Sequence, residues 1–200
     1  MEALSKLVEL NTKISNTTQI AYWQNYILRA EKSASKKEKT NRTKLIASSA
    51  ALSLAKTMKQ DFDNIKLTLP LNTSLKKKKS VMQKAVKLYG RASSYGISET
   101  ATESTHTIGE IYLAFSKALI NSEKPKNLNK DELEQYQILL EDKAFAFEEN
   151  AIGFFETNLA HSKEGVSNSY ITNSLKRLKE VFPTRYARKL KLDDYVNVIH

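Results

Sequence analysis

The chain has 200 residues, of which only five are glycine and three are proline, and it contains no cysteine. The absence of cysteine excludes disulfide bonds, thiolate metal sites and a cysteine nucleophile. Apolar residues make up 40% of the chain, which is too much for a disordered protein and too little for a bundle of membrane-spanning helices. The 32 basic residues outnumber the 22 acidic ones, so the formal net charge is +10 and anionic partners have to be considered.

The positive charge is concentrated in the first half of the chain. The net charge is +12 over residues 1–89 and +1 over residues 90–130. It falls to −7 over residues 131–165 and returns to +4 over residues 166–200. These opposite charges could attract each other or two different partners, so we expect a surface that is polarised along the chain.

Regularly spaced apolar side chains predict helices along the whole chain. Stripes with steps of three and four residues run over 20–34, 54–65, 81–95, 108–119 and 171–182. The low glycine and proline content also favours helix, and no long segment alternates between polar and apolar residues as strands do. We therefore expect an all-α fold of seven or eight helices, paired antiparallel through short loops into a short curved solenoid.

Turn-forming residues separate these stripes. The first break spans Leu69–Ser74, where Asn72 to Ser74 offer helix N-caps. A second break follows near Gly96, and Asn129 is suited to cap a helix whose first turn is acidic. Gly165 marks the break before the final stripe. These positions predict where the long helices begin and end.

Two features of the stripes concern packing. Gly109 lies inside a periodic helix, where glycine costs about 1 kcal/mol relative to alanine, so we expect a neighbouring helix to approach it closely. Trp23 lies on an apolar stripe, and we interpret it, together with Tyr22 and Tyr26, as part of the core.

A distinctive run begins at Thr107 with the sequence Thr-Ile-Gly-Glu-Ile-Tyr and continues through Phe115, Ala118-Leu119 and Ser122-Glu123-Lys124-Pro125. Further residues of the pattern are Leu133-Glu134-Gln135-Tyr136, Leu139-Leu140-Glu141, Ala144-Phe145-Ala146-Phe147-Glu148-Glu149, Ala151-Ile152, Asn158 and Pro183-Thr184-Arg185-Tyr186. The segment from about Val81 to Lys189 thus resembles bacterial tetratricopeptide-repeat (TPR) proteins of the cell envelope. Genes for that family often lie beside TonB/ExbB/ExbD energy-transduction systems or gliding-motility genes. The resemblance implies a TPR-like α-solenoid that acts as a periplasmic or envelope-associated scaffold, usually as the C-terminal part of a longer chain.

The chain departs from this family in identifiable ways. The family usually carries proline at the position of Ala146, where it starts a helix after a break. With alanine there, residues 129–161 could form one long helix, but we expect a break or kink near Phe145. The standard TPR signature, with its period of about 34 residues, is absent. The resemblance leaves residues 1–75 unmatched, which suggests a basic helical region over 1–75 that packs on a TPR-like region over 76–200.

Lys76, Lys77, Lys78 and Lys79 form the densest run of positive charge. Four cations near a helix start oppose the helix dipole, so local helix stability does not explain them. They are a candidate anion site for nucleic acid, anionic lipid or an acidic partner, and the alternative is a solvated turn that keeps the protein soluble. The wider basic region over 32–87 supports the same second hypothesis, a helical protein that binds nucleic acid or an anionic surface.

Glu141, Glu148 and Glu149 belong to an acidic segment that begins at Asp131. Carboxylates seven residues apart could line one helix face, but no Glu-x-x-His motif accompanies them, so we expect a partner-facing or solvated stripe and no metal. Arg185 and Tyr186 match the end of the family pattern. They could contact a partner or fasten the last helix.

No catalytic constellation is evident in the sequence. The three histidines, His106, His161 and His200, do not fall into a Ser-His-Asp or His-Glu-x-x-His arrangement, and there is no glycine-rich phosphate loop. We therefore expect no enzyme activity and no cofactor. The expected function is a scaffold that binds another protein, such as a component of envelope energy transduction or motility.

The sequence shows no segment that would cross a membrane. The longest apolar stretch, Ile46 to Ala55, has ten residues, whereas a helix that spans a bilayer needs about 20. The first ten residues contain two glutamates and do not resemble a signal peptide. We expect a periplasmic or envelope location where the resemblance applies, and otherwise a cytoplasmic one.

Overall fold

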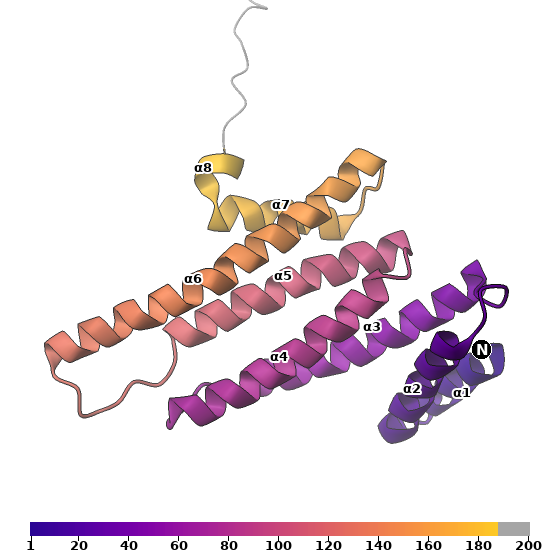
Figure 1. Ribbon diagram of the computed structural model, residues 1–200, viewed down its shortest axis with the longest axis horizontal. Coiled ribbons are helices and arrows are strands. Elements are labelled where there is room, and N and C mark those ends of the chain that lie inside the picture. Colours follow the sequence, from indigo (N-terminus) through magenta and orange to yellow (C-terminus); the bar gives the residue numbers. More distant parts are fainter. Residues whose placement is uncertain (188–200) are drawn as a thin grey trace, which may run out of the picture.

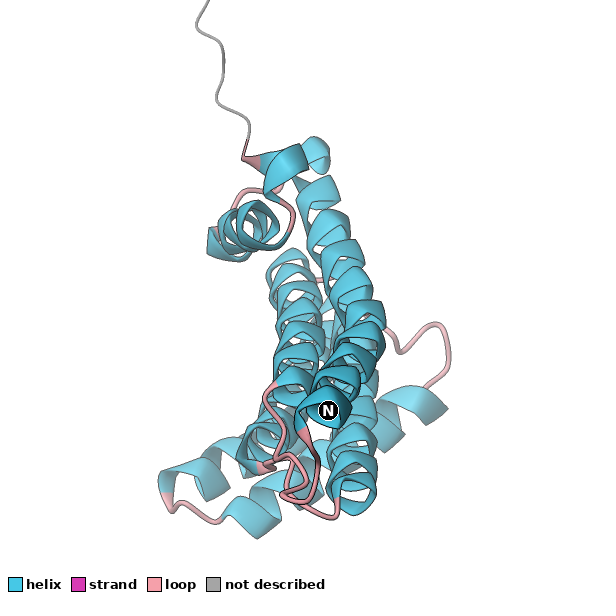
Figure 2. Ribbon diagram, turned by 90° about the vertical axis from the view of Figure 1, so that its left-hand side faces the viewer, coloured by secondary structure: helices cyan, strands magenta, loops and turns pink. Residues whose placement is uncertain are grey.

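The computed structural model describes residues 1–187 and shows a chain of eight α-helices. They are α1 (Glu2–Lys13), α2 (Thr17–Ser33), α3 (Asn41–Asn64), α4 (Leu71–Ser93), α5 (Ser98–Ile120), α6 (Lys130–Ala160), α7 (Ser169–Val181) and α8 (Pro183–Tyr186), with a short 3-10 helix, η1 (His161–Glu164), before α7. Helices and loops make up all the described residues, and none of these residues is in a strand (Figure 2). The predicted all-α fold of seven or eight helices is confirmed. The end of the predicted 76–200 region, with His200, lies outside the described residues.

Each helix packs against the next one in the chain. Helices α3 to α6 lie side by side, with α1 and α2 beyond α3 and with α7 and α8 beyond α6 (Figure 1). Short loops connect the long helices, so neighbours in this row run in opposite directions. The fold is therefore a stack in which sequence order is also spatial order.

Three clusters of buried apolar residues hold the stack together. The first joins α2, α3 and α4 around Ile27, Ala51 and Ala92. The second lies among α3, α4, α5 and α6 and contains Phe62, Tyr89, Phe115 and Ala144, among others. The third joins α5, α6 and α7 through Leu113, Ala151, Phe155 and Leu178. The predicted boundary between residues 75 and 76 falls inside α4, which shares the second cluster with α3.

The ends of the helices follow the predicted turn chemistry only in part. Asn129 caps α6 as predicted, since its side chain accepts a hydrogen bond from the Glu132 amide at 3.0 Å and the Glu132 carboxylate accepts one from the Asn129 amide at 2.9 Å. At the start of α4, however, Pro70 occupies the N-cap position expected of Asn72 to Ser74. The Ser74 hydroxyl instead donates to two preceding backbone carbonyls.

Helix α6 is continuous over 31 residues, so the expected break near Phe145 is wrong. Ala146 favours helix and, unlike proline, keeps its backbone N–H available to the helix. Ala144 and Ala151 are both fully or almost fully buried on the side of α6 that packs on α5, so one neighbouring helix supports both halves.

A neighbouring helix, α6, approaches Gly109 of α5 closely, as the place of this glycine in a periodic helix predicts. A Cβ atom built at Gly109 would lie 2.5 Å from a ring carbon of Phe155 on α6, well inside van der Waals contact. The absence of a side chain therefore lets the Phe155 ring, which is fully buried, rest on the backbone of α5.

The interpretation of Tyr22 and Tyr26 as core residues is wrong. The exposed fractions of these two side chains are 54% and 46%, and half-buried Trp23 packs edge-on against both. The buried side of α2 consists of residues such as Ile27 and Leu28, and the two tyrosines lie off that stripe. The structure contains no described helix that is both long enough and apolar enough to span a bilayer.

Candidate functional site

The outward face of α6 carries exposed apolar side chains. Ile138, Leu139 and Phe145 have exposed fractions of 52%, 49% and 61%. Ile138 and Phe145 are seven residues apart and therefore lie two turns apart on the same face of the helix. The buried face of α6, which contains Leu140 and Ala144, packs on α5, and no described helix covers the opposite face of this half.

Carboxylates surround these apolar side chains. Glu134, Glu141, Asp142 and Glu149 are all exposed, and their spacing on the helix places them on the same outward face as Phe145. None of the four takes part in an ion pair within residues 1–187, whereas Glu110 and Glu156 on the same pair of helices do. This face therefore presents negative charge that no described cation neutralises. We call the surface formed by these residues, with Ile138 and Leu139, the acidic face of α6.

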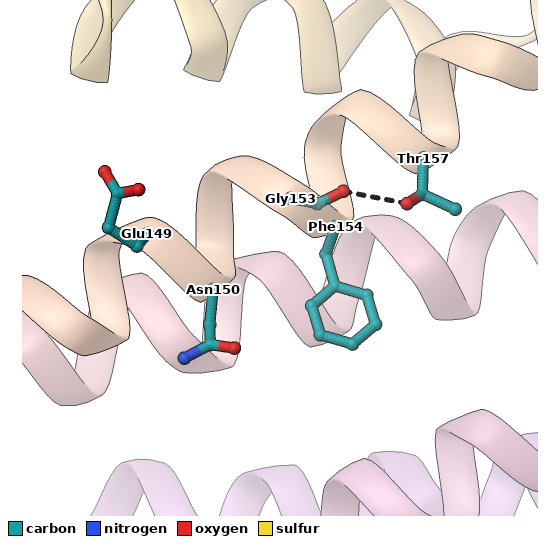
Figure 3. A pocket seen from close by; sticks show the side chains of 5 residues that line it. All are labelled: Glu149, Asn150, Gly153, Phe154 and Thr157. Carbon is teal, nitrogen blue, oxygen red and sulfur yellow. Dashed lines mark hydrogen bonds between the residues drawn. The ribbon is translucent and has the colours of Figure 1, made fainter.

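A shallow hollow continues the acidic face toward the C-terminal end of α6. It has a volume of about 380 Å³ and is lined by Glu149, Asn150, Gly153, Phe154 and Thr157, all from α6 (Figure 3). A Cβ atom at Gly153 would meet no atom within 4 Å, so the missing side chain leaves the space open. The Phe154 ring stacks on Tyr112 of α5, with ring centroids 5.6 Å apart, and this contact fixes one wall.

The three glutamates predicted from the sequence do not share one role. Glu141 and Glu149 are exposed on the acidic face, whereas Glu148 is half-buried between α5 and α6. The hydroxyl of Ser116, which is fully buried, donates a hydrogen bond to the Glu148 carboxylate at 2.8 Å. Glu148 therefore holds two helices together, and only the other two glutamates are free to contact a partner.

The run of four lysines is also divided. Lys76, Lys77 and Lys79 are exposed on α4, but Lys78 is only 5% exposed. The Lys78 ammonium donates hydrogen bonds to the backbone carbonyls of Phe62 at 2.8 Å and Ile65 at 2.7 Å, and it lies 4.0 Å from the centre of the Phe62 ring. Burial lowers the pKa of Lys78, although the nearby Asp63 carboxylate opposes that shift. Lys78 thus satisfies carbonyls at the end of α3 and is not part of a surface anion site.

Arg185 and Tyr186 both contact Glu156. The Arg185 guanidinium lies 3.0 Å from the Glu156 carboxylate, and the Tyr186 hydroxyl donates a hydrogen bond to the same oxygen. The Arg185 guanidinium also lies 5.4 Å from the centre of the Tyr186 ring. These contacts join α8 to α6, which is the fastening role that the sequence left open for this pair.

A buried polar network joins α5, α6 and α7, and the sequence spacing did not reveal it. His106 Nδ1 lies 2.9 Å from the Ser174 hydroxyl, which also accepts a hydrogen bond from the Asn158 side chain at 2.9 Å. Burial lowers the pKa of His106, the Glu110 carboxylate opposes this shift and Arg177 adds to it. Because Ser174 is fully buried, the Ser174–His106 pair joins helices and presents no accessible nucleophile.

No metal site can be assigned in the described part of the chain. Within residues 1–187, no group of three or more histidine, aspartate or glutamate side chains is arranged to hold a metal ion. The acidic face therefore offers charge and apolar surface rather than a coordination site. No family model matches the chain, and the comparisons with curated proteins and with solved structures found no similar protein.

Proposed function

We propose that the protein is a non-enzymatic scaffold that binds a basic amphipathic helix of a partner protein along the acidic face of α6. One observation carries this proposal: Ile138 and Phe145 are exposed within a group of carboxylates that have no ion-pair partner in the described structure. Apolar side chains on such a face can pack with the apolar stripe of a partner helix, while its lysines and arginines pair with the surrounding carboxylates.

The hollow beside Gly153 supports the same geometry. The hollow is shallow and open, and the missing side chain at Gly153 leaves room for a side chain of a helix that lies along α6. Large side chains that fill such hollows supply most of the binding energy at interfaces, whereas the rim charges mainly set orientation and association rate.

The proposed location is the bacterial cell envelope, with energy-transduction or motility components as partners. The support for this part is the resemblance of residues 81–189 to envelope TPR proteins. Cell fractionation tests it, and recovery of the protein in the cytosolic fraction alone would contradict it.

A photo-crosslinking experiment tests the acidic face. A benzoylphenylalanine introduced in place of Phe145 should crosslink to a basic helical segment of another protein in cells that produce the full chain. The same group in place of Tyr22, a similarly exposed aromatic residue on α2, serves as the control. Equal crosslinking from both positions would show that contact is non-specific.

A peptide experiment measures the contributions of shape and charge. An amphipathic helical peptide of leucine and lysine should bind the protein, whereas its leucine–glutamate counterpart should not. The double variant Ile138→Ser/Phe145→Ser should weaken binding about tenfold or more. Leu10→Ser/Ile14→Ser removes two exposed apolar side chains on α1 and just after it, and should leave binding unchanged.

The charge arm of this experiment uses matched carboxylate variants. Glu141→Gln/Asp142→Asn should weaken binding and reduce its dependence on salt, because the partner loses two ion pairs. Asp61→Asn/Glu99→Gln removes two exposed carboxylates on α3 and α5 and should have a much smaller effect. If both pairs of substitutions weaken binding equally, only net charge matters and the proposed face is wrong.

A second candidate function is binding of nucleic acid or an anionic surface by residues 32–87. It is supported by the exposed lysines Lys76, Lys77 and Lys79 near the start of α4. A titration with DNA, RNA and acidic vesicles at increasing salt tests this function. Absence of binding at low salt would exclude it.

A further inference from the structure

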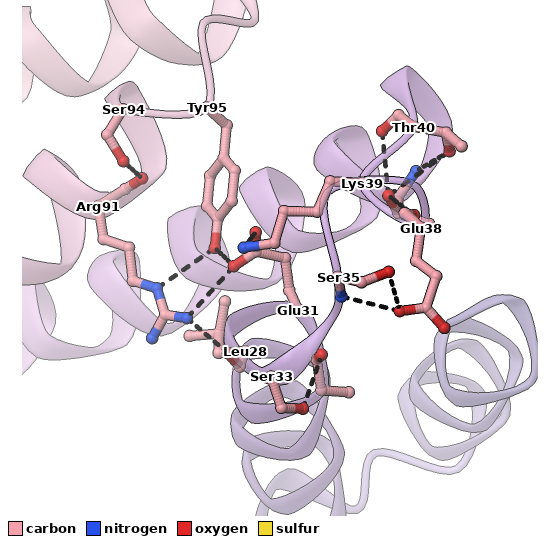
Figure 4. A network of polar contacts seen from close by, with 12 residues as sticks. Leu28, Glu31, Ser33, Ser35, Glu38, Lys39, Thr40, Arg91, Ser94 and Tyr95 are labelled. Atoms are coloured by element: carbon pink, nitrogen blue, oxygen red, sulfur yellow. Dashed lines mark hydrogen bonds and ion pairs between the residues drawn. The ribbon is translucent and has the colours of Figure 1, made fainter.

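A second charged site lies at the other end of the stack, where α2 ends, α3 begins and α4 ends (Figure 4). These three segments line an open pocket of about 510 Å³. Its lining residues are Glu31, Lys32, Lys39, Lys44, Arg91, Ser94 and Tyr95. Four of them are cations and one is an anion, so the lining has a surplus of three positive charges.

The single carboxylate in the pocket is held by several partners. Glu31 is largely buried, and its carboxylate lies 3.0 Å from the Lys39 ammonium and 3.8 Å from the Arg91 guanidinium. The Tyr95 hydroxyl donates a hydrogen bond to the same carboxylate at 3.0 Å. Glu31 therefore compensates one positive charge and fixes the position of two cations without neutralising the pocket.

Arg91 is already oriented before any ligand binds. One of its terminal nitrogens donates to the backbone carbonyl of Leu28, and its Nε donates to the Tyr95 hydroxyl at 3.3 Å. The remaining terminal nitrogen, Nη1, has no hydrogen bond within the described structure. A side chain held in this way loses little conformational freedom on binding, which favours affinity.

Lys32 and Lys44 supply the positive charge that is not compensated. Neither side chain takes part in an ion pair within residues 1–187, although Lys44 is half-buried at the start of α3. Two unpaired ammonium groups and a fixed guanidinium line one pocket that already contains the Glu31 carboxylate. The remaining positive charge matches a compact ligand with two negative charges better than a second single carboxylate.

We propose that this pocket binds a phosphomonoester group, with Lys32, Lys44 and Arg91 as its charged contacts. The pocket is open and larger than inorganic phosphate needs, so it leaves room for the rest of a molecule that carries the phosphate. That molecule is either a soluble organic phosphate or a lipid whose headgroup is a phosphomonoester. The site involves α2, α3 and α4, so it is independent of the acidic face on α6.

Calorimetric titration with glycerol 3-phosphate at fixed ionic strength tests the proposal for the soluble source. We expect saturable binding that sulfate and chloride at the same ionic strength do not reproduce. Lys32→Ala/Lys44→Ala should lower the affinity about tenfold or more, because each ammonium contributes a charge-assisted contact. Lys36→Ala/Lys37→Ala removes the same charge from exposed positions outside the pocket and should change the affinity less than about twofold.

A gain-of-affinity variant makes the test independent of any loss of folding. Glu31→Gln removes the internal carboxylate that competes for Lys39 and Arg91, and it should strengthen phosphate binding. Asp61→Asn removes an exposed carboxylate on α3 outside the pocket and should have little effect. Circular dichroism verifies that each variant is folded.

Vesicles distinguish the two sources of the phosphate. Binding to vesicles that contain phosphatidic acid, with none to vesicles of phosphatidylglycerol at equal surface charge, identifies a lipid phosphomonoester. Failure to bind either glycerol 3-phosphate or phosphatidic acid would overturn the proposal. So would an equal loss of affinity in both lysine double variants, or binding confined to nucleic acid, since each outcome indicates general electrostatic attraction.

Discussion

Gly109 lies in the interior of α5 and Gly90 in the last turn of α4, and their surroundings are opposite. A Cβ atom at Gly109 would overlap the Phe155 ring, whereas one at Gly90 would meet nothing within 4 Å. Gly109→Ala should lower the free energy of unfolding by about 1–3 kcal/mol, because overpacking a buried ring outweighs the gain in helix propensity. Gly90→Ala should raise it by about 0.5–1 kcal/mol. Urea denaturation measures both, and a stabilising Gly109→Ala would contradict the close approach of α5 and α6.

Lys78 differs from its neighbour Lys77 only in the direction that its side chain takes. Replacing Lys78 with methionine keeps an apolar stem but leaves the carbonyls of Phe62 and Ile65 without their donor. We expect Lys78→Met to lower the free energy of unfolding by about 1–3 kcal/mol. Lys77→Met, on the exposed side, should change it by less than about 0.5 kcal/mol. Equal effects in denaturant titrations would exclude a capping role for Lys78.

The sequence contained a signal for Lys78 that a search for charge clusters passes over. Leu75, Lys78, Met82 and Ala85 are separated by steps of three and four residues, so Lys78 occupies a position on the apolar stripe of α4. A charged residue on such a stripe indicates a buried hydrogen-bonding partner. For Lys78 the partners are the backbone carbonyls of Phe62 and Ile65. Which carbonyls these are depends on how α4 packs against α3, and no local pattern contains that information.

At the scale of single helices, the N-terminal half of α6 depends on its own capping residues because it packs on α5 alone. Asn129→Ala removes one of the two reciprocal hydrogen bonds of the capping box and should cost about 1 kcal/mol. The loss should appear as faster hydrogen exchange of the amides in the first turn of α6. Asn127→Ala, in the preceding loop, serves as the control and should leave exchange there unchanged.

Helix positions were largely predictable because apolar periodicity and turn residues are local properties. Asn129 and Gly109 were assigned correctly for that reason. The break expected near Phe145 was wrong because it came from the family pattern rather than from the residues themselves, and Ala146 favours a continuous helix. The sequence partly predicts the acidic face, since the charge pattern points to Glu141 and Glu149. The exposure of Ile138 and Phe145 depends on which face of α6 meets α5, and that is decided by tertiary packing.

At the scale of the whole molecule, the His106 network makes stability depend on pH. Burial holds the pKa of His106 below its ordinary value of about 6.5, so the unfolded chain binds a proton more readily than the folded one. The free energy of unfolding should therefore fall as the pH drops from about 7 toward the pKa of the folded state. His106→Gln should weaken this dependence in unfolding experiments between about pH 7 and 5. An unchanged slope would show that other groups cause it.

The serial arrangement of the three cores means that the two ends of the molecule can open separately. Helices α1 and α2 pack on α3, and the polar contacts of Arg91 and Tyr95 with Leu28 and Glu31 join the end of α4 to α2 beside the shared apolar cluster. Stack-like folds of this kind lose their terminal units first, because those units have a neighbour on one side only. A ligand in the pocket between α2, α3 and α4 would therefore stabilise the packing of α1 and α2 on the rest of the stack and slow their local unfolding. It would leave the far end of the stack and the acidic face of α6 unaffected.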